Sequence, residues 1–362
     1  MTDKAIQGEK RVFMTGNEAL AWAALAAGAD IMYGYPITPQ NEVMHYWTRM
    51  APKYGKKFLQ TEDELSAGFT TIGGILAGKR AFSATAGPGT TLFQEPISMA
   101  EMMRIPLVMA IMQRGGPSTA TVIYSQQEVN MVTYGGNGEG WRVVYSTATH
   151  QELYDYMIKS FNTAWTYRFP TFVLADGYQA KMREPFVMYD PEERGIKMVE
   201  TKPFVGLPGV PGVDRPAAHL RNTYSVEEEL YEALMPIQQE YEAMIDQVVE
   251  WEEENVDDAE VIILSHGVVS RAAKAAKNRL REKGYKVGYF RPITLRPFPE
   301  KQLQRVAAKC SNFLLIESAI GQFARLVKEA LFNVPVSRLE TIYKPGVGFT
   351  AEELVEKIEG AC

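Results

Sequence analysis

The chain has 362 residues, of which 46% are hydrophobic and 23% charged, and its formal net charge at pH 7 is −6. This length and composition suffice to bury a core in two or three domains. The acidic balance argues against nucleic acid or an anionic membrane surface as a partner. We find no signal peptide at the start and no apolar run near the roughly 20 residues of a membrane span. We therefore expect a cytoplasmic protein with protein and small-molecule partners, no nucleic acid and no membrane.

Side chains that ligate metals are scarce. The chain has two cysteines, Cys310 and Cys362, whereas an iron–sulfur cluster typically needs four thiolates. None of the four histidines stands at metal spacing from a second ligand. We expect no metal site in this chain, so any redox cluster would belong to another polypeptide.

Short apolar runs alternate with longer amphipathic ones in the first half of the chain. Thr15–Glu18 and Thr61–Glu64 each have the form of a capping box that opens a helix. Strands that alternate with helices predict a parallel sheet covered on both faces. We assign this α/β domain to residues 1–184. We expect its strands at residues 12–14, 30–35, 58–60, 80–87, 105–113, 141–146 and 170–176.

The sequence changes character at residues 185–257. Repeated Pro and Gly up to residue 224 disfavour regular structure and predict a linker. From residue 225 to about 254 the chain is acidic, with apolar residues spaced four and three apart, as on one face of a long helix. Those apolar residues are Leu230, Leu234, Ile237, Tyr241, Met244 and Val248. A second α/β series follows at residues 258–362.

Four stretches that could carry chemistry each follow a predicted strand of the first domain. Because the carboxyl ends of parallel strands meet at one edge of a sheet, where ligands bind, we expect the four to converge. The glycine-rich stretch lacks the Gly-Lys-Ser/Thr ending of a phosphate loop, and the chain has no Gly-x-Gly-x-x-Gly fingerprint. The stretches are Tyr35–Pro39, Gln60–Glu64, Thr85–Thr91 and Gln113–Ser118.

Each polar residue in these stretches also has a purely structural interpretation. Thr38 could cap the following helix, with Pro39 in its first turn. Glu64 could complement the dipole at a helix N-terminus. Arg114 could be a surface charge that ends a strand. Convergence favours the ligand-binding interpretation of Arg114. For Glu64 that interpretation rests on the small, apolar helix that follows, and for Thr38 on the rigidity that two prolines give its loop.

Longer motifs give the chain a resemblance to a known family. The stretches GYPITPQNE, QTEDELSAGFTTIGGILAGKRAFSATAGPGTTLFQE, IPLVMAIMQRGGPSTA, KVGYFRPITLRPFP and NFLLIESAIGQF occur in this order. Together they resemble the alpha subunit of 2-oxoacid:ferredoxin oxidoreductases, in the branch that includes 2-oxoisovalerate and 2-oxoglutarate enzymes. The resemblance implies a thiamine-diphosphate pyrimidine-binding α/β domain with a parallel sheet, followed by an α/β domain like the carboxyl-terminal domain of transketolase. It implies oxidative decarboxylation of a 2-oxoacid with coenzyme A to acyl-CoA, CO2 and reduced ferredoxin.

The resemblance also assigns roles to single residues. It places Glu64 at the ring nitrogen of the aminopyrimidine, as the acid that activates thiamine diphosphate. It places Thr38 and Arg114 against the substrate carboxylate and its neighbouring oxygen. The other residues that it places near the cofactor are Tyr35, Pro36, Ile37, Gly87 and Pro88. Gln40-Asn41 stands where many relatives carry small hydroxyl residues, so the recognition of the substrate side chain is left open.

The chain contains no Gly-Asp-Gly, the motif that holds the diphosphate through a metal in thiamine enzymes. The resemblance therefore implies a beta subunit that carries the diphosphate and Mg²⁺ site and the 4Fe–4S cluster, with gamma and delta subunits as further candidates. Two alternatives remain at this point: one half of a non-oxidative thiamine-dependent decarboxylase, and a non-catalytic assembly subunit. The 2-oxoacid could be 2-oxoisovalerate, 2-oxoglutarate, pyruvate or an aryl compound.

Overall fold

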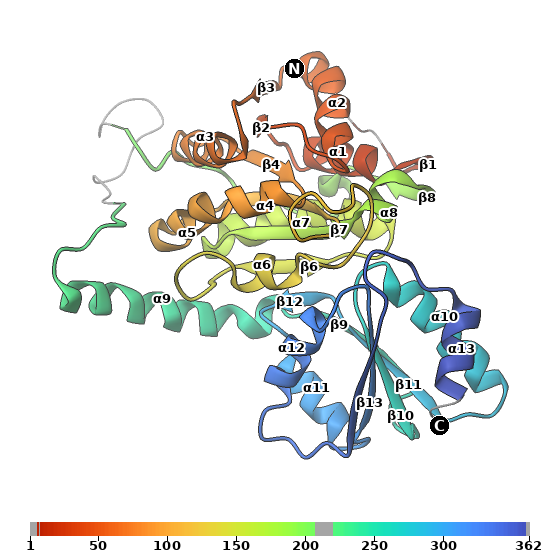
Figure 1. Ribbon diagram of the computed structural model, residues 1–362. Helices are drawn as coiled ribbons and strands as arrows, with labels where there is room; N and C mark the ends of the chain where they lie inside the picture. The colour runs from red at the N-terminus through yellow and green to blue at the C-terminus, as the bar shows by residue number, and fades with distance from the viewer. Residues whose placement is uncertain (1–5, 7, 207–219, 360–362) are drawn as a thin grey trace.

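The structure is a computed structural model that describes residue 6 and residues 8–206 and 220–359. The described residues form two α/β units, one built on a seven-stranded sheet and the other on a five-stranded sheet, and a separate two-stranded pair. Figure 1 shows the first unit above the second, with the long helix α9 (Glu227–Val248) running along their boundary and beyond it. The expected α/β class and parallel sheets are confirmed.

The larger sheet has the strand order β12-β6-β7-β5-β4-β2-β3. All neighbouring pairs within it are parallel except β12 with β6. Because strands of one direction share an edge, the carboxyl ends of β2 to β7 lie together. The strands are β2 (Ile31–Gly34), β3 (Lys57–Gln60), β4 (Ala81–Thr85), β5 (Val108–Gln113), β6 (Val143–Ser146), β7 (Thr171–Asp176) and β12 (Thr294–Arg296).

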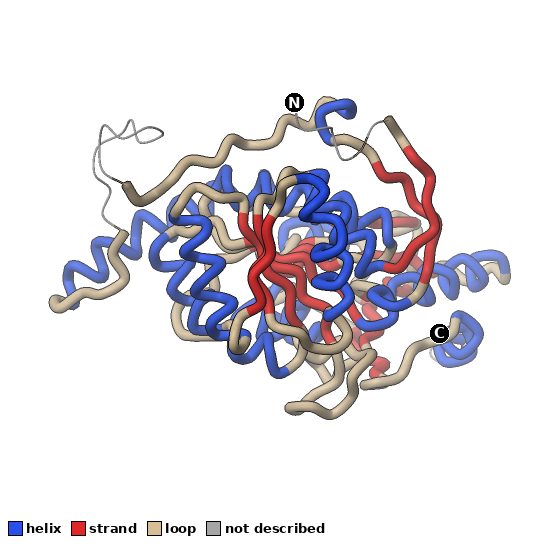
Figure 2. The backbone as a smooth tube through the Cα atoms, turned by 90° about the horizontal axis from the view of Figure 1, so that it is seen from above, coloured by secondary structure: helices blue, strands red, loops and turns tan. Residues whose placement is uncertain are grey.

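Helices cover both faces of this sheet, as Figure 2 shows from above. Side chains of β5 alternate between the two covered faces. On one face Val108 and Ala110 belong to an apolar core shared with α1, α2 and α7. On the other face Met109 and Ile111 belong to an apolar core shared with α3 and α5. The helices of this unit are α1 (Gly16–Ala26), α2 (Asn41–Met50), η1 (Ala51–Tyr54), α3 (Glu64–Leu76), α4 (Pro88–Leu92), α5 (Gln94–Met103), α6 (Val129–Tyr134), α7 (His150–Tyr167) and α8 (Gly177–Lys181).

The second unit has the strand order β14-β13-β10-β11-β9. α10 and α13 pack on one face of its sheet, and α11 and α12 pack on the other (Figure 1). Its strands are β9 (Trp251–Glu254), β10 (Val261–Ser265), β11 (Val287–Pro292), β13 (Asn312–Glu317) and β14 (Arg338–Tyr343). Its helices are α10 (Val269–Glu282), α11 (Glu300–Ala307), α12 (Gln322–Ala330) and α13 (Ala351–Glu359).

Several segments differ from the sequence-based prediction. The strand expected at residues 12–14 is β1 (Lys10–Thr15), which pairs antiparallel with β8 (Arg183–Met188) and stays outside the main sheet. β8 and the short helix η2 (Pro191–Arg194) occupy part of the stretch expected to lack regular structure. The acidic helix ends at Val248 rather than near 254, because residues 251–254 form β9 and pair with β11.

The apolar face predicted for α9 is only partly buried. Ile237, Tyr241, Met244 and Val248 pack against the first unit, whereas Leu230 is 37% exposed and Leu234 is half-buried. The first part of α9 extends beyond the body of the molecule in Figure 1. No helix among residues 8–206 and 220–359 is long and apolar enough to cross a membrane.

Two glycines of α3 give a matched test of the packing between α3 and α5. A Cβ on Gly68 would lie 2.4 Å from Pro96 Cγ, whereas a Cβ on Gly73 would meet nothing within 4 Å. We predict that Gly68→Ala lowers the free energy of unfolding by about 1–3 kcal/mol. Gly73→Ala should raise it by about 0.5–1 kcal/mol, because alanine is the better helix former. Urea denaturation of both variants checks this, and a Gly68→Ala variant as stable as the parent would contradict the packing.

Candidate active site

The structure brings the four predicted stretches to one edge of the seven-stranded sheet. They follow β2, β3, β4 and β5, which are neighbours in the order β5-β4-β2-β3 and run parallel. The predicted convergence is therefore observed. The roles assigned to the single residues stay predictions at this stage.

The loop Tyr35–Pro39 is fixed through its carbonyl groups. Gln40 Nε2 donates to the Tyr35 carbonyl at 2.9 Å, and Asn17 Nδ2 donates to the Pro39 carbonyl at 2.7 Å. The Thr38–Pro39 peptide is cis, and α2 begins at Asn41 with Gln40 at its N-cap. The prediction that Thr38 caps this helix is therefore wrong, because the chain makes a further turn before the helix starts.

Glu64 is the first residue of α3, and its side chain is buried, with 5% exposure. The capping box expected at Thr61–Glu64 is not formed, because the side chain of Asp63 accepts the hydrogen bond from the Ser66 amide at 2.7 Å. Asp63 thus caps the helix and leaves the Glu64 carboxylate free of that task. Burial raises the pKa of the Glu64 carboxyl, and the Arg114 guanidinium opposes the rise.

The glycine-rich turn after β4 lies directly against both charged residues. A Cβ on Gly89 would lie 2.7 Å from Glu64 Oε1, so only glycine lets α4 approach the carboxylate this closely. Gly87 has a φ of 54°, and a Cβ there would lie 2.5 Å from Arg114 Nε. The turn therefore lies between a buried carboxylate and a buried guanidinium, and its glycines permit this close approach.

Arg114 follows β5 and is 4% exposed, so its interpretation as a surface charge is wrong. Its Nη1 donates to the Thr38 carbonyl at 2.7 Å, which ties the end of β5 to the loop after β2. Its Nε is buried without a hydrogen-bond partner among the described residues. Burial lowers the pKa of the guanidinium, and Glu128 and Glu64 oppose this. Because a buried donor left unpaired costs free energy, an anionic ligand would stabilise this arrangement.

Sequence reasoning missed Glu128, which is buried beside the turn. Its carboxylate accepts hydrogen bonds from the Gly87 amide at 2.7 Å, the Arg114 amide at 2.8 Å and the Thr90 hydroxyl at 2.5 Å. The only signal in the sequence was an acid directly before the short apolar helix α6, which is too common to single out.

Several buried polar atoms at this edge have no hydrogen-bond partner in the described part of the chain. They include Thr85 Oγ1, Gln113 Oε1, Gln40 Oε1 and Asn41 Oδ1, besides Arg114 Nε. Buried charged groups and polar atoms without a hydrogen-bond partner among the described residues, gathered around a glycine turn, are typical of a site that binds a small molecule. Within the described residues no group of three or more His, Cys, Asp or Glu is placed to hold a metal ion.

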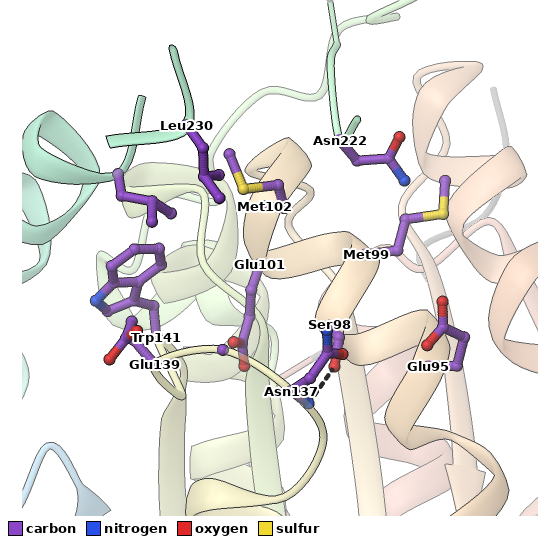
Figure 3. A pocket seen from close by; sticks show the side chains of 12 residues that line it. Glu95, Ser98, Met99, Glu101, Met102, Asn137, Glu139, Trp141, Asn222 and Leu230 are labelled. Atoms are coloured by element: carbon purple, nitrogen blue, oxygen red, sulfur yellow. Dashed lines mark hydrogen bonds between the residues drawn. The ribbon is translucent and has the colours of Figure 1, made fainter. Parts of the chain in front are cut away.

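A separate cavity of about 400 Å³ lies between α5, the loop at 137–141 and the first part of α9 (Figure 3). None of the predicted site residues lines it. Its buried acid, Glu101, is paired with Arg142, whose Nε donates to Glu101 Oε1 at 2.5 Å. The cavity is therefore distinct from the edge that holds Glu64 and Arg114.

The larger α/β unit belongs to a thiamine-diphosphate-binding class of protein, as a family model shows. The family model described as "Pyruvate flavodoxin/ferredoxin oxidoreductase, thiamine diP-bdg" matches residues 22–254. A second model, "Pyruvate:ferredoxin oxidoreductase core domain II", matches residues 259–354. The chain belongs to the pyruvate flavodoxin/ferredoxin oxidoreductase family, and the resemblance read from the sequence is confirmed.

Curated relatives agree with this assignment. The chain is 36% identical over 328 residues to the 2-oxoglutarate synthase subunit KorA of Methanocaldococcus jannaschii, covering 86% of this chain and 89% of that one. It is 35% identical over 317 residues to the ketoisovalerate oxidoreductase subunit VorB of Methanothermobacter marburgensis, covering 87% and 88%. Both relatives are subunits of larger enzymes.

Solved structures share the fold. The 2-oxoglutarate:ferredoxin oxidoreductase of Magnetococcus marinus, solved with 2-oxoglutarate, coenzyme A and succinyl-CoA bound, matches with a TM-score of 0.85 and 26% identity. The match covers 97% of this chain and 65% of that chain, which is therefore considerably longer. A split-gene transketolase matches with a TM-score of 0.57 and 12% identity, which shows likeness of fold alone.

Proposed function

We propose that the chain is the thiamine-pyrimidine-binding subunit of a 2-oxoacid:ferredoxin oxidoreductase. The complete enzyme oxidatively decarboxylates a 2-oxoacid with coenzyme A to acyl-CoA and CO2, and ferredoxin takes the electrons. The observation that carries the proposal is the pair of buried opposite charges, Glu64 and Arg114, on either side of the Gly87–Gly89 turn. Family membership and the names of the relatives support the same reaction.

Glu64 is proposed to hold the ring nitrogen of the aminopyrimidine through its carboxylate. When bound, thiamine diphosphate supplies the nucleophilic carbon and the electron sink for decarboxylation. An ionised carboxylate at the ring nitrogen favours the tautomer in which that nitrogen carries a proton. An uncharged amide in the same place does not. We propose residues 35–37, Gly87 and Pro88 as further cofactor contacts, because the loops that hold them follow β2 and β4 at the sheet edge where Glu64 begins α3.

Arg114 and Thr38 are proposed to bind the carboxylate and neighbouring oxygen of the 2-oxoacid. The unpaired Nε of Arg114 is buried at the edge that holds Glu64, and its Nη1 is already fixed by the Thr38 carbonyl. A guanidinium held in this way is preorganised for a planar anion. The two relatives are named for different 2-oxoacids, 2-oxoglutarate and ketoisovalerate.

The diphosphate, Mg²⁺ and the 4Fe–4S cluster are proposed to belong to a beta subunit, with gamma and delta subunits as further candidates. The sequence has no Gly-Asp-Gly and only two cysteines, which supports this division. An apolar rim beside the site supports a partner that covers it: Leu65, Phe69 and Leu92 are 37%, 37% and 45% exposed on α3 and α4. The cytoplasmic location expected from the sequence stays a prediction.

The two alternatives have less support. A half of a non-oxidative decarboxylase usually lacks a second α/β domain, whereas residues 259–354 match the oxidoreductase core domain II. A non-catalytic subunit would have no need to bury Glu64 and Arg114 with unpaired polar atoms around them.

Replacement of Glu64 tests the cofactor role. We predict that Glu64→Gln in the reconstituted complex lowers kcat by roughly 100- to 10,000-fold, because the amide cannot act as the charged acceptor. Glu62→Gln, on the exposed side of the same stretch, is the matched control and should keep the parent rate. Decarboxylation at the parent rate by the Glu64 variant would return Glu64 to a structural role.

Replacement of Arg114 tests the substrate role. Lysine keeps the charge but loses the planar fork, so Arg114→Lys should lower kcat/KM by about 10- to 150-fold for every 2-oxoacid accepted. Affinity for thiamine diphosphate should stay near that of the parent complex. The control is Arg49→Lys, at an exposed position of α2, which should keep the parent kcat/KM. Steady-state kinetics on two 2-oxoacids would reject the role if kcat/KM were unchanged for both.

The division of the cofactor between chains is tested with the isolated chain. We predict that it binds thiamine diphosphate weakly in the presence of Mg²⁺ and has no iron–sulfur absorbance. Calorimetric titration with and without the beta subunit measures the difference. Submicromolar binding by the isolated chain, or a visible chromophore, would contradict the division.

A further inference from the structure

The segment at residues 125–130 connects the active-site edge to the second unit. Gln126 is fully buried. Its backbone amide donates to the Ser318 carbonyl at 2.9 Å, and its side-chain Oε1 accepts from the Ser318 backbone amide at 2.9 Å. Its Nε2 donates to the His266 carbonyl at 2.9 Å. Every one of these bonds is made to a strand end of the second unit, after β13 or β10.

Neighbouring residues strengthen the same connection. Ser125 Oγ donates to the Ser318 carbonyl at 2.8 Å, and Gln322 Nε2 donates to the Gln127 carbonyl at 2.8 Å. Gly267 has a φ of 57°, and a Cβ there would lie 2.9 Å from Gln126 Nε2. The second unit therefore holds this segment through side-chain and backbone groups at once, and a side chain at Gly267 would displace the Gln126 amide.

Glu128 stands two residues further on and faces the other way, into the active-site edge. Its three hydrogen bonds reach the turn after β4, through the Gly87 amide and Thr90 hydroxyl, and the residue after β5, through the Arg114 amide. A displacement of Glu128 would therefore shift both the turn and the arginine. Misplacement of a substrate-binding group by about 1 Å can cost on the order of 100-fold in rate.

We propose that Gln126 and Glu128 are positioning residues, through which the strand ends of the second unit set the place of Arg114 for substrate capture. The inference rests on the proposed function of Arg114. It gives the second unit a part in substrate binding, although the residues proposed to touch cofactor and substrate all belong to the first unit. Gln126 contacts no reacting group and acts only through this segment.

The test is a double-mutant cycle in the reconstituted complex. Gln126→Met removes the side-chain bonds to the second unit at similar volume, and we expect it to lower kcat/KM for the 2-oxoacid by about 10- to 100-fold, mainly through KM. In an Arg114→Lys background the same change should cost no more than about 2-fold, because the arginine that it positions is already gone. Gln304→Met is the control: it removes two side-chain bonds within the second unit, to the Glu300 carboxylate and the Ala330 carbonyl, and should leave kcat/KM unchanged in both backgrounds.

A second variant keeps the test usable if Gln126→Met does not assemble. Gly267→Ala displaces Gln126 from the side of the second unit and should show the same loss and the same non-additivity. Equal losses in the two backgrounds, or no loss at all, would overturn the positioning role while leaving Arg114 as the carboxylate ligand. Parent kinetics for Arg114→Lys itself would instead reject the proposed function of Arg114, and the positioning role with it.

Discussion

Two opposite charges, on Glu64 and Arg114, are buried at the carboxyl edge of one parallel sheet, with the Gly87–Gly89 turn packed against both. Burial disfavours the charged form of each side chain, as their pKa directions show, so the surrounding structure must hold them in place. Asp63 caps α3 in place of Glu64, the Thr38 carbonyl and the Glu128 carboxylate accept hydrogen bonds from Arg114, and glycines stand where a side chain would not fit. Polar atoms at this edge that have no hydrogen-bond partner among the described residues, such as Thr85 Oγ1 and Arg114 Nε, are consistent with the proposed ligand site.

The second unit is joined closely to the first. One apolar core runs through both, including Val144 and Phe172 from the larger sheet and Leu315 and Phe323 from the second unit. β12 adds to the larger sheet by pairing with β6, and the Gln126–Ser318 hydrogen bonds lie at the same boundary. Apolar packing and hydrogen bonds together stabilise the boundary between the two units, so we expect the strand ends of the two units to keep their relative positions.

The sequence predicted most features that depend on neighbouring residues, such as helix caps, or on a repeating apolar pattern, such as buried strands. Thr15 caps α1 as expected, and the apolar runs give the parallel strands whose shared direction brings Glu64 and Arg114 together. The prediction that Thr61 caps α3 was wrong, because Asp63 lies closer to the start of the helix and caps it instead. Both residues can cap a helix, and their spacing in the sequence does not show which one does. β9, β12 and Glu128 were missed for a common reason. Their partners lie dozens of residues away or in another loop, and short segments acquire such roles only from tertiary contact.

The central claim is that this chain presents a glutamate to the thiamine pyrimidine and an arginine to the substrate carboxylate at a single sheet edge. The most direct measurement is an experimental structure of the assembled complex with thiamine diphosphate and a 2-oxoacid bound. We expect the Glu64 carboxylate within hydrogen-bond reach of the pyrimidine ring nitrogen, about 2.6–3.2 Å, and Arg114 paired with the substrate carboxylate. A cofactor held entirely within a partner chain, or a substrate carboxylate paired with some other residue, would contradict it.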